Sequence, residues 1–370
     1  LKIRFGMKNS FGTSVSVTLF GESHGAQIGA VLDGMAPGIP VNREFISSQL
    51  RKRAPVGKIS TPRHESDEFT ICSGVFGDKT TGTPICITIP NQNTKSEDYE
   101  STRWLARPGH ADYTSNCKYH GFEDYRGGGH FSGRITAPLV AVGAIALSAL
   151  SARGIKVGTH IKSVHGVCDR GFKNIKDDID ALSEMDFAVL DGEKGALMRA
   201  EIEKAGASGD SVGGVLQTAV YGMPAGIGEP WFDTVESMLS HALFGIPGIK
   251  GVSFGDGFGL SQLLGSEAND GFRMAGDRIV TETNRNGGIN GGITNGMPIV
   301  FDCAVKPTPS ISKEQKTVNF SKRENTSIGV RGRHDPAIIH RARVVVDSVA
   351  GIVLCDLLAA RYGTDYFCVS

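Results

Sequence analysis

The sequence predicts an α+β fold for a chain of 370 residues, because strand-like and helix-like segments both occur in it. Val15–Phe20 alternates apolar and hydroxyl side chains, which is typical of a half-buried strand, and Ile28–Leu32 follows as a second strand. Ala137–Leu150 and Val344–Ala360 are the longest apolar runs. They are too short or too polar to span a bilayer, so we expect two buried helices.

Two turns of similar sequence, about half the chain apart, indicate an internal duplication. Gly34–Ile39 precedes a helix expected at Asn42–Arg53. Gly222–Ile227 follows a strand-like run at Val215–Tyr221 and precedes a helix-like segment at Phe232–Leu243. Turns rich in glycine and proline can also resemble each other by chance. The repeat favours two similar halves around a shared core.

Composition excludes several classes of protein. The chain has 49 glycines without a three-residue period and is 40% hydrophobic, so it is neither collagen-like nor disordered. Its formal net charge is zero, which argues against nucleic acid or a membrane surface as a partner. The seven cysteines are widely spaced and form no C-x-x-C pair, which argues against a disulfide framework and a metal site. We therefore expect a cytoplasmic protein.

The stretch Phe122–Pro138 predicts an anion-binding site. Three glycines, Gly127–Gly129, precede His130, Ser132 and Arg134, and the apolar helix follows directly. Glycines let a ligand approach the backbone, and a helix N-terminus attracts negative charge. A glycine hinge between a loop and a core helix would show the same pattern.

A second motif, Gly21–Gly25, matches the G-x-S-x-G pattern of serine hydrolases, with Ser23 as the nucleophile. That pattern needs a strand, a sharp turn and then a helix. Here a second strand follows instead, so the hydrolase interpretation lacks its structural context. His24 then lies on a loop between strands, where it can exchange a proton near neutral pH.

Basic residues are concentrated in two further loops. The first loop follows the helix that ends at Arg53 and contains Lys58, Arg63 and His64. The second precedes the last long helix and reads Arg-Gly-Arg-His-Asp-Pro at residues 331–336. The first cluster exceeds what a helix C-terminus needs, and cations at a helix start, as in the second, are unfavourable unless an anion or Asp335 compensates them. The first cluster favours a small ligand with several negative charges.

Taken together, the motifs of this chain resemble the chorismate synthase family. The resemblance extends from about Asn9 to Arg361, and the motifs occur in the order of the family. They are Gly21–Gly25 with Asp33-Gly34, Arg107–Tyr113, Tyr125–Gly129 with Ser132–Arg134, Lys306–Thr308, and Arg333–Pro336. One domain at residues 9–362 is expected, with an N-terminal extension at 1–8 and a C-terminal tail at 363–370.

The resemblance implies a lyase that converts 5-enolpyruvylshikimate 3-phosphate to chorismate and phosphate, in the shikimate pathway to the aromatic amino acids. The reaction is a trans-1,4-elimination that needs reduced FMN without net redox change. The implied fold is a single-domain β-α-β sandwich with a helical core flanked by antiparallel sheets. A serine hydrolase using Ser23 and a non-catalytic binder of phosphorylated metabolites are the alternative functions.

Residue roles are also implied by the resemblance. His24 resembles the histidine that protonates the reduced flavin, and His110 the one that assists the departing phosphate. Ser23, Ser132 and Asp335 resemble residues that relay protons at the flavin. The positions that match flavin contacts are His130, Phe131, Ser132, Pro247, Gly248, Gly291, Lys306, Pro307, Thr308, Pro309, Ser310 and Arg333. The substrate-binding positions are Lys52, Arg53, Lys58, Arg107 and Arg134.

The chain departs from the family pattern at several of these positions. His130-Phe131 stands where Arg-Ser or Arg-Ala is usual, and Ile135 stands where Glu is usual. Lys52 and Lys58 replace arginines, which keeps the charge but loses bidentate geometry. These differences bear most directly on the affinity for FMN and substrate.

Partners are implied in the same way. The resemblance implies a homotetramer. The flavin is reduced either on this enzyme by NADPH or by a separate flavin reductase. The chain has no G-x-G-x-x-G dinucleotide motif after a strand, which favours an outside reductant.

Overall fold

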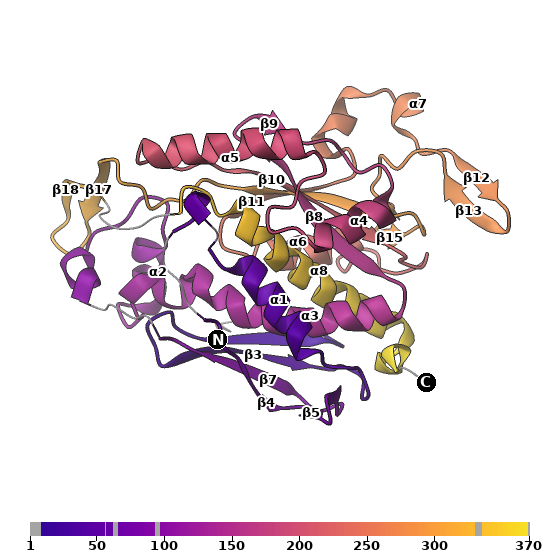
Figure 1. The fold of residues 1–370 in the computed structure, drawn as a ribbon, viewed down its shortest axis with the longest axis horizontal. Coiled ribbons are helices and arrows are strands. Elements are labelled where there is room, and N and C mark those ends of the chain that lie inside the picture. The colour runs from indigo at the N-terminus through magenta and orange to yellow at the C-terminus, as the bar shows by residue number, and fades with distance from the viewer. Residues whose placement is uncertain (1–8, 56, 62–65, 93–96, 330–334, 369–370) are drawn as a thin grey trace, which may run out of the picture.

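Two five-stranded antiparallel sheets enclose a layer of helices in the structure, a computed structural model (Figure 1). It describes residues 9–55, 57–61, 66–92, 97–329 and 335–368. This architecture confirms the expected α+β sandwich with a helical core. Arg63, His64 and residues 330–334 lie outside the described part of the chain.

The first sheet has the strand order β1-β2-β3-β7-β4, and every pair in it is antiparallel. Its strands are β1 (Ser10–Phe11), β2 (Ser16–Gly21), β3 (Gln27–Asp33), β4 (Thr70–Ser73) and β7 (Ile85–Pro90). The predicted pair of strands near the N-terminus corresponds to β2 and β3, which form a hairpin.

The second sheet has the order β11-β16-β10-β8-β9 and is also antiparallel throughout. Its strands are β8 (Lys156–Val164), β9 (Val167–Cys168), β10 (Gly214–Tyr221), β11 (Ile249–Phe254) and β16 (Ile299–Val305). The strand predicted before the second glycine-rich turn is β10, the central strand of this sheet.

Four helices lie between the sheets: α1 (Arg43–Arg53), α3 (Thr136–Ala152), α6 (Val235–Leu243) and α8 (Ile339–Tyr362). α3 packs against β3 and β7, α8 packs against β8 and β10, and the two helices pack against each other. α3 and α8 confirm the two predicted buried helices. The predicted segment at Phe232–Leu243 begins only at Val235, because Thr234 caps it by accepting the Ser237 N–H at 3.0 Å.

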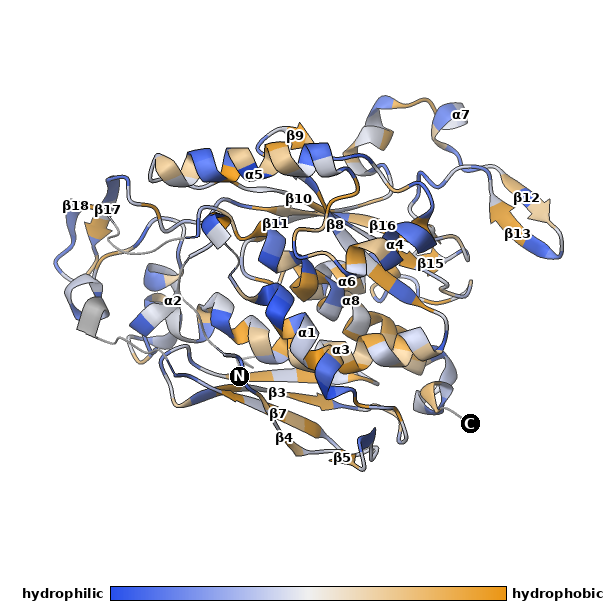
Figure 2. Cartoon of the chain, in the orientation of Figure 1, coloured by the Kyte–Doolittle hydropathy of each residue, from blue (hydrophilic) through white to orange (hydrophobic). Residues whose placement is uncertain are grey.

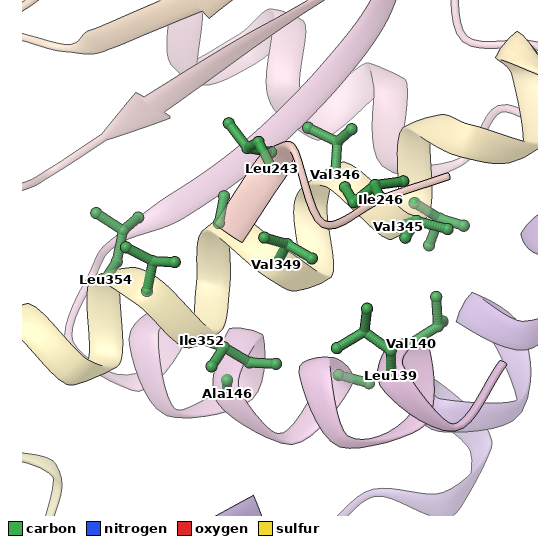
Figure 3. Close-up of a cluster of buried hydrophobic side chains, with 14 of the residues drawn as sticks. Leu139, Val140, Ala146, Leu243, Ile246, Val345, Val346, Val349, Ile352 and Leu354 are labelled. Carbon is green, nitrogen blue, oxygen red and sulfur yellow. The ribbon is translucent and has the colours of Figure 1, made fainter. Parts of the chain in front are cut away.

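The crossing of α3 and α8 depends on a small residue. A Cβ atom placed on Gly143 would lie 2.3 Å from the Ser348 Cβ, so the two backbones approach closely there. Figure 3 shows the apolar side chains that surround the crossing and point toward one another. They are Leu139, Val140 and Ala146 from α3, Leu243 and Ile246 at the end of α6, and Val345, Val346, Val349, Ile352 and Leu354 from α8.

α3 is apolar on all sides, as expected for a helix buried all around. Figure 2 shows hydrophobic residues along α3 and along the neighbouring strands β3 and β7. By length and composition, the segment 133–152 is the one described helix that could cross a membrane. Of its most apolar window, 72% is buried inside the protein, as in a core helix between two sheets.

The outer face of the second sheet is covered by α4 (Ile175–Ser183). The Thr159 hydroxyl on β8 donates to Asp347 of α8 at 2.6 Å, so Thr159 faces the helical layer. The preceding residue, Gly158, must face outward because side chains alternate along a strand. A Cβ at Gly158 would lie 2.9 Å from a methyl carbon of Ile179, which places α4 on that outer face.

The remaining elements are short or peripheral. α5 (Gly192–Ala207) lies beside β8 and β9. The others are α2 (Asp112–Tyr119), α7 (Gly265–Ala268), the 3-10 turns η1 (Gly57–Ile59), η2 (Glu97–Thr102), η3 (Arg126–Phe131), η4 (Gly133–Ile135), η5 (Gly257–Gln262) and η6 (Thr364–Phe367), and the ribbons β5/β6 (Val75–Phe76, Lys79–Thr80), β12/β13 (Phe272–Ala275, Arg278–Thr281), β14/β15 (Ile289–Asn290, Ile293–Thr294) and β17/β18 (Gln315–Asn319, Glu324–Ile328).

The two similar turns occupy comparable positions. Each follows a strand inside a five-stranded sheet and leads to a helix of the central layer. Gly34 and Gly222 both have positive φ values, +83° and +88°, which glycine adopts without strain. The methionine after each glycine is buried, Met35 at 4% and Met223 at 3% exposure. The expected duplication therefore has a counterpart in the fold.

A separate feature is an arm formed by residues 257–281. It contains η5, α7 and the β12/β13 ribbon, and it extends away from the body at the upper right of Figure 1. Several large apolar side chains on this arm are exposed: Phe258, Leu264, Phe272, Met274 and Ile279. Such a surface is typical of an interaction site.

Candidate active site

One large cavity brings together most of the predicted site residues. Its volume is about 1210 Å3. His24, His110, Arg134 and Asp335, which come from four distant parts of the sequence, all line it. Among the described residues, no group of three or more His, Cys, Asp or Glu side chains is placed to hold a metal ion.

The cavity lies at the N-terminal ends of α3 and α8 and extends between these helices. Thr136 and Ile338, at the starts of the helices, line it. Deeper side chains on its wall are apolar: Leu139, Val345, Val349 and Ile352. The site therefore combines an apolar floor with a rim of charged side chains.

His24 is held by its neighbour Ser23 in the turn between β2 and β3. The Ser23 hydroxyl lies 3.0 Å from His24 Nδ1 and can donate to the backbone carbonyls of Arg126 and Gly127, at 3.2 and 3.3 Å. The contact with Ser23 holds the imidazole ring in one orientation, and a histidine ring can exchange a proton near neutral pH.

The triple glycine is shaped by this histidine. Gly127–Gly129 all have positive φ values. A Cβ on Gly127 would lie 2.2 Å from His24 Cε1, so the imidazole occupies the space that a side chain would need. Tyr99 packs against His24 from another direction, edge to face, with ring centroids 5.0 Å apart. The glycines were expected to let a ligand approach the backbone; at Gly127 the group that approaches is the His24 side chain.

His110 is held by a loop 200 residues away in sequence. Its Nε2 lies 2.8 Å from the Ser310 hydroxyl oxygen. Lys306 Nζ donates to the carbonyl of Gly109 at 2.7 Å, which fixes the turn before the histidine. The loop 306–310, predicted as a flavin contact, therefore also positions His110.

Arg53 and Arg134 share one buried carboxylate. Asp67 Oδ2 accepts from Arg53 Nη2 at 2.8 Å, and Asp67 Oδ1 accepts from Arg134 Nη1. Burial raises the pKa of Asp67, but the two guanidinium groups outweigh it and the pKa lies below its usual value. Arg134 also donates to Asn91 Oδ1 at 3.2 Å and to the carbonyl of Pro90 at 3.3 Å. In the described part of the chain, this cluster combines two guanidinium groups with one carboxylate.

Arg107 is committed to a bidentate pair with Asp112. Its Nε and Nη2 donate to the two carboxylate oxygens at 2.8 and 2.7 Å. This pair holds the turn that carries His110 at the start of α2. Arg107 lines the cavity, and its structural contact within the turn is with Asp112.

Asp335 joins two loops at the start of α8. Its carboxylate accepts from the backbone N–H of Thr61 at 2.8 Å and from Arg341 Nη1 at 2.7 Å. Arg341 also donates to the carbonyl of Arg53 at 2.7 Å. The loop after α1 is thus tied to the loop before α8.

The predicted flavin contacts fall mostly on the cavity wall. His130, Phe131, Ser132, Pro247, Gly248 and residues 306–310 line it. His130 Nδ1 donates to the carbonyl of Gly21 at 2.8 Å, and the Ser132 hydroxyl accepts the Arg134 N–H at 3.3 Å. Both side chains therefore also stabilise local backbone.

Three predicted site residues lie away from this wall. Lys52 reaches toward the end of α4, where its Nζ donates to the carbonyl of Ser183 at 2.5 Å. Lys58 is exposed on η1, and Gly291 lies in the turn between β14 and β15. None of the three lines the cavity formed by the described residues. Arg333 lies outside the described part of the chain.

Sequence reasoning missed four residues that shape the site: Asp67, Asn91, Tyr99 and Arg341. Asp67 has the clearest signal in the sequence, because it belongs to an acidic segment (Glu65, Asp67 and Glu68) that follows a run of cations and can supply a charge partner. Asn91, Tyr99 and Arg341 have no such signal in one sequence. Their roles follow from contacts with residues far away in the chain.

Positive charge predominates on the cavity wall. The cationic side chains that line it are Arg53, Arg103, Arg107, Arg134, Lys250, Lys306 and Arg341. The carboxylates that line it are Asp67, Asp112, Glu123, Asp124 and Asp335. Seven cations against five carboxylates, in the described residues, suit an anionic ligand.

The G-x-S-x-G segment does not have hydrolase geometry. It forms the β2-β3 turn, with a strand on each side and no helix after Ser23. This confirms the expectation from the sequence that the motif is followed by a strand and not by the helix of a serine hydrolase.

Known proteins resemble this chain over almost its whole length. A family model described as chorismate synthase matches residues 15–359. A chorismate synthase from Dehalococcoides mccartyi is 48% identical over 96% of this chain and 98% of its own, and one from Thermococcus kodakarensis is 42% identical over 95% and 97%. A crystal structure of chorismate synthase aligns with a TM-score of 0.73 at 28% identity, covering 95% of this chain and 94% of the other. The chain therefore belongs to the chorismate synthase family and is a lyase.

Proposed function

We propose that this lyase converts 5-enolpyruvylshikimate 3-phosphate to chorismate and phosphate, and that it requires reduced FMN. The observation that carries the proposal is the shared cavity, in which two histidines and several arginines from distant segments meet. The substrate has a phosphate and two carboxylates. A cavity wall with more cations than carboxylates reduces the cost of bringing these charges together.

The described residues fit a flavin beside the substrate. The cavity volume of about 1210 Å3 exceeds the roughly 300–1,000 Å3 of a usual single-ligand site, which supports two ligands. The apolar floor between α3 and α8 suits a flat aromatic ring. Two buried polar atoms, Arg53 Nε and Thr308 Oγ1, have no hydrogen-bond partner in the described protein, so each can meet a ligand atom.

The residues that would hold FMN are the loop 306–310, Pro247-Gly248 and His130-Phe131. When bound, reduced FMN would lend an electron to the substrate transiently, regain it as phosphate leaves, and accept the proton that leaves the substrate ring, so that no net redox change results. His24, whose Nδ1 lies 3.0 Å from the Ser23 hydroxyl, would exchange a proton at the wall of the cavity. Ser23 keeps the ring in one orientation.

His110 would act on the departing phosphate as a general acid. The Ser310 hydroxyl oxygen, 2.8 Å from His110 Nε2, holds the ring at the cavity wall. The protonated imidazole would give a proton to the departing phosphate. The arginine cluster around Asp67 would bind a negatively charged group of the substrate.

An anaerobic assay of phosphate release tests the proposal. The substrate is incubated with reduced FMN, with oxidised FMN and without flavin, and release is expected only with reduced FMN. His110→Ala should lower turnover by roughly 10²-fold or more while FMN still binds. His165→Ala is the matched control, because His165 is exposed outside the cavity.

Other outcomes would support the alternatives. Hydrolysis of a simple ester without flavin, lost in Ser23→Ala, would support the serine hydrolase. Tight binding of the substrate without any product would support a binder of phosphorylated metabolites. An unchanged rate in His110→Ala would remove His110 from the mechanism.

Three further proposals concern the oligomeric state, the source of the reduced flavin and the location of the enzyme in the cell. We propose a homotetramer, supported by the exposed apolar arm. We propose that the flavin arrives reduced from a separate reductase; turnover with NADPH and FMN alone would show instead that this enzyme reduces its own flavin. A cytoplasmic location agrees with the seven free cysteines, all within the described residues.

A further inference from the structure

Two cysteines lie beside each other on neighbouring strands of the first sheet. In the pairing of β4 with β7, Ile71 is opposite Ile87 and Ser73 is opposite Cys86, with an irregularity between the two pairs. Cys72 is therefore the extra residue of a β-bulge, next to Cys86. A bulge places two residues of one strand against one residue of its partner.

Both thiols are on the outer face of the sheet. Ile85, Ile87 and Ile89 are fully buried against the helical layer, so Cys86 between them faces outward. The Cys72 thiol lies 3.6 Å from the Thr88 hydroxyl, which is on the same outer face. Cys72 is exposed and Cys86 is half-buried, so a small reagent can reach the pair.

The two thiols are close enough to influence each other. Burial raises the pKa of Cys86, and the neighbouring Cys72 thiol raises it further. At the bulge, Cys72 and Ser73 both lie against the single residue Cys86 of the neighbouring strand. Neighbouring strands are roughly 4.7–4.9 Å apart, and a disulfide joins residues whose Cα atoms are roughly 4.4–6.8 Å apart. The spacing of the two strands therefore suits a cross-link.

We propose that Cys72 and Cys86 form a redox-active thiol pair, which a low-molecular-weight disulfide converts to a cross-strand disulfide. Nothing in the proposed lyase reaction uses these residues, so the pair is a separate modification site.

The chemistry is a thiol–disulfide exchange in two steps. The exposed Cys72, as a thiolate, attacks one sulfur of the small disulfide, forms a mixed disulfide and releases one small thiol. Cys86 then attacks Cys72 Sγ and releases the second small thiol. The two protein thiols lose two electrons and two protons, and the small disulfide gains both. A small thiol in excess reverses the reaction.

The two strands that carry the pair are continuous with the segments that hold the arginine cluster. β4 begins three residues after Asp67, and β7 ends one residue before Asn91. Asp67 and Asn91 both accept hydrogen bonds from Arg134. A bond between Cys72 and Cys86 would therefore fix the spacing of the two strands that carry the partners of Arg134.

The test uses the full chain, reduced and then incubated with glutathione disulfide. After free thiols are alkylated, trypsin should separate Cys72, in peptide 64–79, from Cys86, in peptide 80–95. We expect these peptides as one disulfide-linked species, in more than about tenfold excess over the form with a glutathione on each cysteine. The second step is intramolecular and therefore fast.

Serine variants provide the controls. Cys72→Ser and Cys86→Ser should each abolish the linked peptides, and Cys86→Ser should retain glutathione on Cys72. Cys168→Ser, which removes another exposed cysteine, should leave the link unchanged. Separate glutathione adducts on Cys72 and Cys86 would overturn the proposal. Linked peptides that form only after the protein is unfolded would also overturn it.

Discussion

At the residue scale, the site depends on charged groups that are held by other charged groups. Asp67 is 7% exposed and binds both Arg53 and Arg134, whose side chains are similarly buried. Removing one member of a buried ion cluster leaves uncompensated charge, which costs far more than losing a surface pair. Asp67 is therefore needed both for stability and for the placement of the two arginines.

Substituting this carboxylate should destabilise the protein. We expect Asp67→Asn to lower the free energy of unfolding by about 3 kcal/mol, because two buried guanidinium groups lose their counter-charge. Asp180→Asn is the control, since Asp180 pairs with Lys156 at the surface and should cost less than about 1 kcal/mol. Urea unfolding of both variants measures the difference. Equal effects would mean that the cluster is screened by solvent.

His340 should make stability sensitive to acid. Burial, with the nearby Arg341 and Arg199, lowers the pKa of His340 to about 3, and its Nε2 is hydrogen-bonded to Ser60 at 2.7 Å. Below pH 6.5, His340 binds a proton in the unfolded state but stays neutral in the folded state. The free energy of unfolding therefore falls as pH drops toward 3. From pH 7 to pH 5, the wild type should lose about 2 kcal/mol relative to His340→Gln.

Asp347 should change the stability of the protein with pH in the opposite direction to His340. Burial raises its pKa to about 6, so the folded state binds the proton first as pH falls, and this group adds stability between pH 6 and 4. The wild type should therefore gain stability relative to Asp347→Asn over that range. Urea unfolding at several pH values measures both differences, and parallel curves for wild type and His340→Gln would contradict the burial argument.

At the element scale, the crossing of α3 and α8 sets the shape of the core and of the cavity. The helices approach where Gly143 meets Ser348, and the cavity opens between their N-terminal ends. α8 is further fixed near its other end by Asp356, which accepts the backbone N–H groups of Thr13, Ser14 and Val15. The N-terminal end of α8 therefore lines the cavity, and Asp356 near its C-terminal end fixes the turn at residues 13–15.

Filling the helix crossing should cost stability. Alanine is the better helix former by about 1 kcal/mol, but its Cβ at position 143 would lie 2.3 Å from Ser348 Cβ and 2.8 Å from Ser348 Cα. Because the backbone must shift, we expect Gly143→Ala to lose about 1–3 kcal/mol net. Gly192→Ala, in a helix with nothing within 4 Å, should not destabilise. Thermal or urea unfolding compares the two; a stabilised Gly143→Ala would show that the helices separate easily.

At the scale of the whole molecule, one apolar core extends across both sheets, while the arm stands apart from it. Met274 is 63% exposed and Ile279 is 65% exposed, and they face each other in the β12/β13 ribbon. Exposed apolar side chains on a projecting ribbon are costly in water unless another surface covers them. A second copy of the chain would cover them in the proposed homotetramer.

Charged residues on the arm should weaken this assembly. We expect Met274→Lys combined with Ile279→Lys to lower the mass in solution from a tetramer toward smaller species, measured by sedimentation equilibrium. Lys316→Glu, on the separate β17/β18 ribbon, is the control and should not change the mass. A tetramer that persists in the arm variant would place the interface elsewhere.

The sequence by itself determined the fold class, the two buried helices and the repeated strand-turn-helix unit, and most of the site residues it predicted line the cavity. These features have local signals: apolar periodicity, glycine at positive φ, and family motifs with fixed residue types. The helix start at Phe232 was wrong because a side-chain cap at Thr234 overrides the apolar pattern.

Only the tertiary structure decided which charged residues meet. The Lys52 side chain on α1 reaches the end of α4 rather than the cavity, Arg107 pairs with Asp112, and Arg53 shares Asp67 with Arg134. The proximity of Cys72 and Cys86 likewise depends on a bulge in strand pairing. Ion pairs and strand register join residues distant in the chain, and their energies depend on burial that no local pattern specifies.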